Sequence, residues 1–441
     1  MSAPPTDWRL LGPILAVQFI GALGLSIVLP FLIVLVLDFG GNEVVYGLVS
    51  AAYPACQLFG APWLGRLSDR VGRRRVLLLS QAGTLAAWLL FAAAFFLPRA
   101  TLAEADGHAW LGTFALTAPL LAILAARALD GLTGGNVAVA TAYLADASTP
   151  ATRKRNFGYL SAAASLGFIV GPALAGLLTA VPLMGHANLL PVALAALISA
   201  VALWVIYRYL RDRPTSSTSG MSAEDAGEGL PPKPASTAGE TTDAPRLTLR
   251  DAARLPGVPL LLGLYFLLYL GFNVFYVAFP VYAADGLGWS TLRLGLFFSV
   301  LSAVLVVVEG PLMGWLSARA GDARLYAVGG LLLALAFAAM ALLPPGWLVA
   351  SAVLFGLGNG LLWPSFVSLL AEAAGDRYQG AVQGLGSSFG SAAAIVGLLG
   401  GGVLYGWLGA GVFWLSALAF AVATLATPWL ASLGPPAGAS S

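Results

Sequence analysis

Twelve apolar stretches, each long enough to form a helix across a lipid bilayer, follow one another along the chain. A transmembrane helix needs about 20 mainly apolar residues. The stretches lack the alternation of apolar and polar positions that marks the strands of a membrane β-barrel. The pattern therefore predicts twelve membrane-spanning helices, near residues 10–37, 44–64, 76–97, 118–145, 157–181, 189–209, 258–283, 292–317, 325–343, 347–371, 380–407 and 411–430.

A polar segment divides these stretches into two groups of six. Residues 214–245 are rich in Ser, Thr, Pro, Gly and Ala and have no periodic apolar pattern, so they cannot bury a core. We predict a disordered cytoplasmic linker over 210–257, with a short surface helix at its end, between a first half (1–209) and a second half (258–441). The predicted fold is an all-α membrane protein with two six-helix pseudo-symmetric bundles.

The basic residues predict how the chain crosses the membrane. Twelve spans put both termini on one side, and Lys and Arg favour cytoplasmic loops. With the termini and the linker inside, all but three of the 22 Lys and Arg residues are cytoplasmic. The exceptions are Arg99 and Arg293, which fall outside, and Arg127, which falls within a span. We expect a multi-pass protein of the inner or plasma membrane with both termini cytoplasmic.

The composition excludes several classes of function. Apolar residues make up 59% of the chain and charged residues 10%, whereas soluble domains average about 25% charged residues. A net charge of +2 favours no nucleic-acid partner. One cysteine, Cys56, and two histidines, His108 and His186, supply no metal-ligand cluster and no nucleophile–base set. We expect no cofactor, no metal and no enzyme activity, and a monomer in the lipid bilayer.

The two halves carry the same loop motif. The loop after the second span reads GAPWLGRLSDRVGRRRVLLL (60–79), and the loop after the eighth reads GPLMGWLSARAGDARL (310–325). Residues 155–158 are echoed in the same way by residues 377–380. Such self-similarity indicates that the halves are duplicates.

These motifs resemble those of the major facilitator superfamily. The loop after the second span matches that superfamily's signature at Gly65, Asp69, Arg70, Gly72 and Arg73. The fifth span reproduces the antiporter signature of its twelve-span drug/proton antiporter branch, at Gly158, Gly167, Gly171, Pro172 and Gly176. The resemblance, to tetracycline and multidrug exporters, covers nearly the whole chain.

The resemblance implies a latch that stabilises the outward-open state. In the family the latch joins the loop aspartate, a loop arginine and an acid that ends span 4, which here are Asp69, Arg73 and Asp146. The alternative is that these charges only anchor and orient the helices. In the second-half copy Ala318 stands at the position of Asp69, so we expect one strong latch.

The fifth span has a second property that suits a carrier. Gly167 and Gly171 form a face of small residues that allows close helix approach, while Pro172 removes a backbone donor and favours a kink. Ordinary packing is the alternative. The second half has Ala393 at the position of Pro172, so the kink is asymmetric, as a rocking carrier would use.

Three ionisable residues fall within predicted spans, where charge is costly and usually functional. Arg127 and Asp130 lie three residues apart on one helix face. They either neutralise each other and hold the helix in register, or form a coupling site at which Asp130 gains and loses a proton. Glu309 has no basic neighbour within a turn, and is either a proton carrier or a side chain that reaches the interface. We predict these three as proton-coupling candidates.

Polar and aromatic residues near the middle of the spans are candidates for a substrate cavity, because carrier sites lie near the bilayer midplane. Each polar residue is alternatively a helix–helix hydrogen bond. Tetracycline exporters carry an acid in span 1 where this chain has Gly21, which argues against a pump for that drug alone. The candidates are Gln57, Asn136, Asn273, Tyr276, Asn359 and Trp363.

We therefore predict a secondary transporter that exports hydrophobic or amphipathic small molecules in exchange for protons, by alternating access. The rival prediction is a proton-coupled symporter, or a lipid or metabolite transporter, with the same scaffold.

Overall fold

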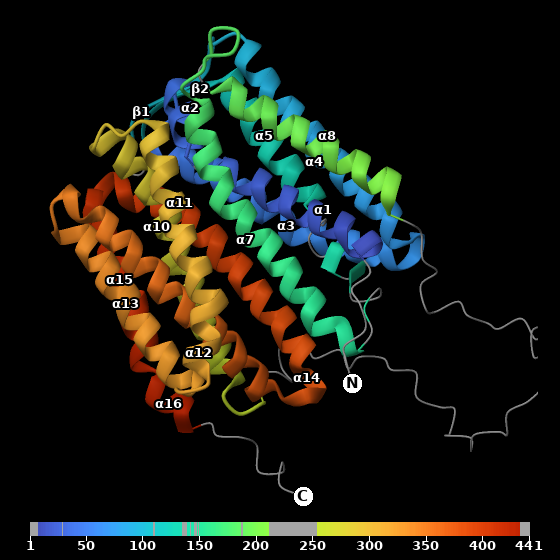
Figure 1. Ribbon diagram of the computed structural model, residues 1–441. Coiled ribbons are helices and arrows are strands. Elements are labelled where there is room, and N and C mark those ends of the chain that lie inside the picture. The colour runs from blue at the N-terminus through green and yellow to red at the C-terminus, as the bar shows by residue number, and fades with distance from the viewer. Residues whose placement is uncertain are drawn as a thin grey trace, which may run out of the picture.

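The first half of the chain forms a bundle of long helices (Figure 1). The computed structural model describes residues 8–28, 30–108, 111–134, 139–141, 143–144, 148, 150–186, 188–210 and 254–432. Long uncharged stretches become helices because a helix satisfies its own backbone hydrogen bonds in lipid. The helices of this half are α1 (Trp8–Ile27), α2 (Leu32–Asp38), α3 (Glu43–Val71), α4 (Arg73–Ala93), α5 (Ala118–Thr133), α7 (Pro150–Leu178) and α8 (Leu189–Tyr209).

The second half forms another bundle beside the first (Figure 1). Its longest element, α14, is broken at Gly375, whose φ of 63° and ψ of 165° are not helical. The break divides α14 into two spans. The α-helices of this half are α10 (Val258–Val281), α11 (Thr291–Val307), α12 (Met313–Ser317), α13 (Asp322–Leu342), α14 (Leu348–Leu408), α15 (Phe413–Leu425) and α16 (Thr427–Ser432). One short 3-10 turn, η1 (Ala94–Phe96), belongs to the first half. The short 3-10 or π turns of the second half are η3 (Tyr282–Gly286), η4 (Val308–Leu312), η5 (Pro345–Trp347) and η6 (Gly409–Val412).

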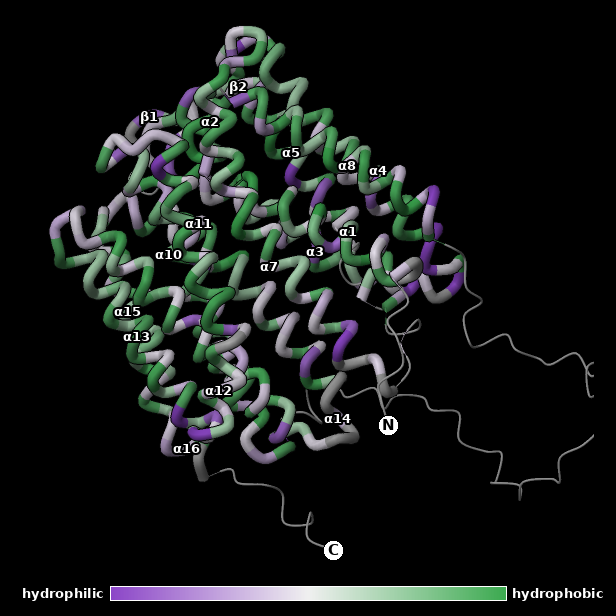
Figure 2. The backbone as a smooth tube through the Cα atoms, viewed as in Figure 1, coloured by the Kyte–Doolittle hydropathy of each residue, from purple (hydrophilic) through white to green (hydrophobic). Residues whose placement is uncertain are grey.

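Every one of the twelve predicted spans contains a helix. In the described ranges, nine stretches are long and apolar enough to cross a membrane, and the pair α1–α2, bent by about 40°, makes a tenth. One of the nine, Ala381–Leu430, is 50 residues long and covers the last two predicted spans. The helices are mainly hydrophobic, with hydrophilic residues concentrated toward their ends (Figure 2). The predicted all-α fold with twelve spans in two bundles is confirmed.

A β-hairpin between α4 and α5 was not predicted by the hydrophobic pattern. Strands β1 (Thr101–His108) and β2 (Gly112–Thr117) pair antiparallel. The hairpin packs on the α2–α3 connection, where the Asn42 side-chain amide donates to the carbonyl of Leu111 at 2.7 Å. The Ala115 amide donates to the carbonyl of Gly40 at 2.8 Å. We call this end of the molecule the hairpin end; α16 lies at the opposite end (Figure 1).

The two halves meet closely near the hairpin end. A methyl group added to Gly47 on α3 would lie 2.6 Å from the carbonyl oxygen of Leu398 on α14, and one on Gly402 would lie 2.5 Å from the carbonyl oxygen of Glu43. A methyl group on Gly176, near the end of α7, would lie 2.8 Å from the Cα of Leu292 on α11. These glycines allow backbones of the two halves to touch.

The predicted linker falls mostly outside the described residues, since residues 211–253 are not described. The predicted surface helix near 246–255 is covered only at its last two positions. The boundaries 1–209, 210–257 and 258–441 therefore stay a prediction.

Candidate functional site

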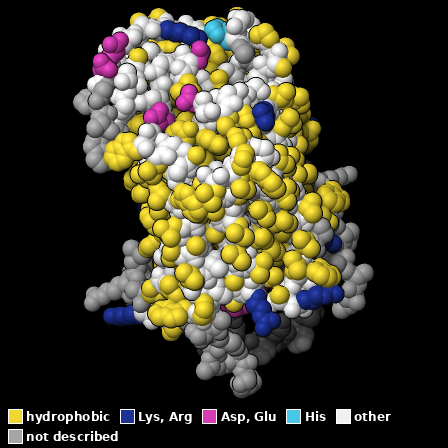
Figure 3. All heavy atoms as spheres, turned by 90° about the vertical axis from the view of Figure 1, so that its left-hand side faces the viewer, with side chains coloured by type: hydrophobic (Ala, Val, Ile, Leu, Met, Phe, Trp, Pro, Cys, Tyr) yellow, Lys and Arg dark blue, Asp and Glu magenta, His cyan; other side chains and the backbone are white. Residues whose placement is uncertain are grey.

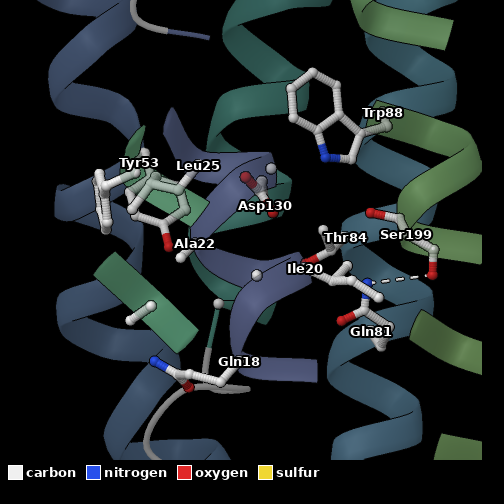
Figure 4. Close-up of a pocket in the computed structure, with 15 residues that line it drawn as sticks. Gln18, Ile20, Ala22, Leu25, Tyr53, Gln81, Thr84, Trp88, Asp130 and Ser199 are labelled. Atoms are coloured by element: carbon white, nitrogen blue, oxygen red, sulfur yellow. Dashed lines mark hydrogen bonds between the residues drawn. The ribbon is translucent and has the colours of Figure 1, made fainter. Parts of the chain in front are cut away.

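A cavity of about 220 Å³ lies inside the first half, among α1, α3, α4, α5, α7 and α8 (Figure 4). Six different helices supply its walls. Its polar lining residues are Gln18, Tyr53, Gln81, Thr84, Asp130 and Ser199, and its apolar lining includes Leu25, Trp88, Ala164 and Phe168. The cavity thus combines apolar walls with one carboxylate and several hydrogen-bonding groups, as small-molecule sites do.

The predicted pair of Arg127 and Asp130 forms at the wall of this cavity. Arg127 Nη1 lies 3.6 Å from Asp130 Oδ2, and the two side chains are 10% and 15% exposed. The guanidinium carbon of Arg127 lies 4.8 Å from the centre of the Tyr53 ring. Since 3.6 Å exceeds the length of a charge-assisted hydrogen bond, the pair is an ion pair with a loose geometry. The Arg127 Nε also lacks a hydrogen-bond partner among the described residues.

Three polar residues that line the cavity with Asp130 were missed in the sequence. Gln81 on α4 donates to the carbonyl of Ser199 on α8 at 3.3 Å, and Thr84, one turn further along α4, interacts with the Asp130 carboxyl group. The side-chain oxygen of Gln18 on α1 is buried without a hydrogen-bond partner among the described residues. Both glutamines stand in otherwise apolar spans, the same signal that singled out Gln57.

Gln57 itself joins two helices and does not line the cavity. Its amide donates to the Tyr53 hydroxyl at 3.0 Å and to the carbonyl of Gly134, just after α5, at 2.9 Å. The contact with Gly134 agrees with the alternative that Gln57 is a helix–helix hydrogen bond. Asn136 lies outside the described residues.

The other substrate candidates lie in the second half and do not line this cavity. The Asn273 amide donates within its own helix, to the carbonyl of Tyr269 at 2.8 Å. Trp363 packs edge-on against the rings of Tyr265 and Tyr269, at 5.4 Å and 5.3 Å between ring centres. Two further candidates, Tyr276 on α10 and Asn359 on α14, are half-buried. These residues border an aromatic core, not the carboxylate.

Glu309 is separate from Asp130. It lies in the π turn η4, between α11 and α12, and is half-buried. The structure therefore brings Arg127 and Asp130 together at one cavity and leaves Glu309 in the other bundle.

Four of the five antiporter-signature residues lie at helix contacts. A methyl group on Gly167 would lie 2.7 Å from the carbonyl oxygen of Phe19 on α1, and one on Gly171 would overlap the hydroxyl of Ser26. That hydroxyl donates to the Gly167 carbonyl at 3.0 Å. By contrast, Gly158 faces open space.

The same helix also meets the second half. Pro172 cannot donate to the carbonyl four residues earlier, and the Ser299 hydroxyl of α11 donates to the neighbouring carbonyl of Ile169 at 3.0 Å. A methyl group on Gly295 of α11 would overlap the Pro172 carbonyl. The signature helix α7 thus contacts α1 in its own half and α11 in the other.

The predicted latch is only partly described. Gly72 joins α3 to α4 with a φ of 99°, a conformation that favours glycine. The guanidinium of Arg73 donates to the Ser68 hydroxyl at 2.7 Å, while Arg70 is exposed and Gly65 faces open space. Asp146 and the Asp69 side chain lie outside the described part of the chain. The latch stays a prediction.

Two bundles of apolar helices, the first of which encloses a cavity with a buried ion pair at its wall, are typical of a polytopic membrane carrier. The sequence model of the Major Facilitator Superfamily matches residues 14–398 and, in a second match, residues 261–441. The chain belongs to the major facilitator superfamily.

Several known proteins are similar to this chain over most of their length. The class B tetracycline resistance protein of Escherichia coli is 27% identical, over 92% of each chain. The class G tetracycline resistance protein of Vibrio anguillarum is 29% identical, over 89% of this chain and 90% of its own. Multidrug resistance protein 2 of Bacillus subtilis is 24% identical, over 88% and 86%.

Solved structures share the fold at lower identity. The human organic anion transporter MFSD10 (TETRAN) superimposes with a TM-score of 0.63 at 21% identity, over 96% of this chain and 100% of its own. A D-xylose–proton symporter gives a TM-score of 0.69 at 15% identity, over 95% and 96%. These matches support the fold.

Proposed function

We propose that the protein exports hydrophobic or amphipathic small molecules in exchange for protons, by alternating access. The relatives named for tetracycline and multidrug resistance match it over most of their length, and they favour export of drug-like compounds. The observation that carries the proposal is the ion pair of Arg127 and Asp130 at the wall of a cavity.

Asp130 is proposed as the proton carrier. While its carboxylate is ionised, Arg127 balances its charge inside the bundle. A proton on Asp130 leaves Arg127 as an uncompensated cation, a state that costs about 3 kcal/mol at the centre of a membrane helix on insertion scales. Protonation of Asp130 is thereby linked to any conformational change that lowers the cost of the uncompensated Arg127 charge. Glu309 in the second half is proposed as an alternative carrier.

The cavity sets a limit on what the first half binds. Its volume of about 220 Å³ is below the roughly 300–1,000 Å³ of sites that enclose a drug-sized molecule. It holds a part of such a molecule or several waters. We propose that the rest of the substrate contacts the second half, with Tyr276, Asn273 and Trp363 as the predicted surface.

The orientation and the latch belong to the same proposal. The positive-inside rule favours a cytoplasmic location for the end opposite the hairpin, where the loop with Arg73 lies. Closure of that end would bring Asp69, Arg73 and Asp146 into the latch, whereas the described contacts between the halves lie near the hairpin end. We propose a monomer in the inner or plasma membrane.

A drug-susceptibility panel tests the proposal in an efflux-deficient bacterial host that expresses the wild type, Asp130→Asn or Glu309→Gln. We expect the wild type to raise resistance to several lipophilic drugs and Asp130→Asn to abolish that gain at equal expression. Normal export by both variants would show that neither acid couples the proton. Inward, proton-driven accumulation of the compounds would favour the symporter instead.

A further inference from the structure

Arg293 is an exposed basic residue that the proposed function does not use. It lies in the first turn of α11 at the hairpin end, one residue after Leu292, which meets α7. Its guanidinium carbon lies 4.4 Å from the centre of the Trp289 ring. No carboxylate among the described side chains forms an ion pair with it. The stack holds the guanidinium in place but leaves its charge uncompensated.

An apolar groove opens beside this guanidinium. The groove has a volume of about 200 Å³ and lies between the start of α11, the turn η5 and the start of α14. Its walls include Leu296, Phe297, Val300, Val349 and Ala352, and Arg293 is the one charged residue among the described residues that line it. A groove with apolar walls and one cation at its rim suits an amphipathic anion.

The groove lies on the part of the surface that faces lipid. Leu296 is 48% exposed, Val300 is 41% exposed and Val349 is 61% exposed, although all three are apolar side chains on spans. Apolar side chains cover the middle of this side of the molecule, and charged groups lie toward its upper and lower edges (Figure 3). The adjacent Trp347 in the turn η5, which is 57% exposed, fits the aromatic belt of a membrane interface. Acyl chains and headgroups therefore reach both parts of the groove.

We propose that this groove binds one phospholipid with a net negative headgroup. Its phosphate contacts the Arg293 guanidinium, and a part of one acyl chain lies along Leu296, Val300 and Val349. An anionic headgroup is preferred because no carboxylate among the described lining residues can pair with the ammonium group of a zwitterionic lipid. One basic residue near a membrane surface contributes about 1 kcal/mol to binding an anionic lipid, which corresponds to about fivefold in affinity. This proposal does not depend on the transported substrate.

Arg99 offers a matched control at the same end of the molecule. Its guanidinium also lies over an aromatic ring, that of Phe39, at 5.2 Å. Unlike Arg293, it is paired with a carboxylate, since its Nη2 lies 2.9 Å from Asp38 Oδ2. Substitution of Arg99 removes the same formal charge from the same end of the molecule, but that charge is already neutralised by Asp38.

The test uses the full chain in nanodiscs of phosphatidylcholine that contain a trace of photoactivatable phosphatidylglycerol or, separately, photoactivatable phosphatidylcholine. Cross-linked peptides are mapped by mass spectrometry. For the wild type we expect labelling of residues 289–300 and 345–352, about fivefold stronger with phosphatidylglycerol. Arg293→Gln should remove the preference, and Arg99→Gln should retain it. Val349→Trp, which fills the groove but keeps the charge, should reduce labelling by both lipids.

Three results would overturn the proposal. They are equal labelling by the two lipids in the wild type, an unchanged preference in Arg293→Gln, and labelling of other segments only. A variant that fails to fold is recognised by its thermal unfolding in the same nanodiscs, and Val349→Trp then tests the groove without a change of charge.

Discussion

At the scale of single residues, the ion pair of Arg127 and Asp130 is defined as much by Tyr53 as by its two charges. Tyr53 stacks on the guanidinium at 4.8 Å and accepts a hydrogen bond from Gln57 at 3.0 Å. Gln57 in turn reaches Gly134 at the end of α5. This chain of contacts positions the arginine, so Tyr53 and Gln57 act through Arg127 in the proposed coupling.

Arg127→Lys tests whether the planar guanidinium matters beyond its charge. Lysine keeps the positive charge, but it lacks the planar fork that stacks on Tyr53 and reaches Asp130. We expect proton-driven transport to fall about tenfold, since a desolvated cation–π contact is worth about 1–2 kcal/mol. The measurement is the initial rate of drug uptake into inverted membrane vesicles, normalised to protein content. A rate equal to the wild type would mean that only the charge counts.

Sequence reasoning predicted this pair and missed its surroundings for a physical reason. Two residues three apart on a helix must share a face, so Arg127 and Asp130 were predicted from spacing alone. Gln18, Gln81 and Ser199 approach the cavity from α1, α4 and α8, and only the packing of those helices brings them together. Spacing along one helix predicts neighbours within it and not between helices.

At the scale of elements, the helices followed from the sequence and the hairpin did not. A span must be apolar and helical because lipid offers its backbone no hydrogen bonds. The apolar stretch near 258–283 can therefore cross the membrane only as a helix, and it forms α10. Strands β1 and β2 contain polar and apolar residues without clear alternation. Their position depends on distant partners, such as the bonds from Asn42 to Leu111 and from Ala115 to Gly40.

Helix α7 contacts α1 through glycines, which gives a matched pair of variants. Gly171→Ala places a methyl group on the Ser26 hydroxyl, which then loses its bond to the Gly167 carbonyl. We expect a loss of about 1–2 kcal/mol in stability and a lower thermal unfolding temperature in detergent. Gly158→Ala lies in open space and should unfold near the wild-type temperature. Equal unfolding temperatures for the two variants would contradict close packing at Gly171.

At the scale of the whole molecule, the halves touch through glycine-lined backbones near the hairpin end. Gly47 and Gly402 lie at the seam between α3 and α14, while Gly176 and Gly295 lie at the seam between α7 and α11. At these glycines no side chain of the glycine itself stands between the two backbones, so the contact there is backbone to backbone. In the proposed cycle, this end opens when the opposite end closes.

Gly402→Leu should keep the hairpin end from closing. A leucine there collides with the backbone of Glu43, whereas position 400, two residues earlier on the same helix, faces open space, so Gly400→Leu serves as the control. Spin labels at Glu104→Cys and Asp285→Cys, in a Cys56→Ala background, report the separation of the halves. We expect a longer mean distance and loss of transport with Gly402→Leu alone. An unchanged distance distribution would mean that closure of the hairpin end does not depend on the contact at Gly402.

The central claim is that Asp130 exchanges a proton for a drug. The most direct test is purified protein in proteoliposomes that enclose a pH-sensitive dye, to which a lipophilic drug is added without any other driving force. For the wild type we predict a drug-dependent proton flux opposite in direction to the movement of the drug. Asp130→Asn should give no proton flux while it still binds the drug. Drug-dependent proton flux in Asp130→Asn equal to that of the wild type would contradict the account.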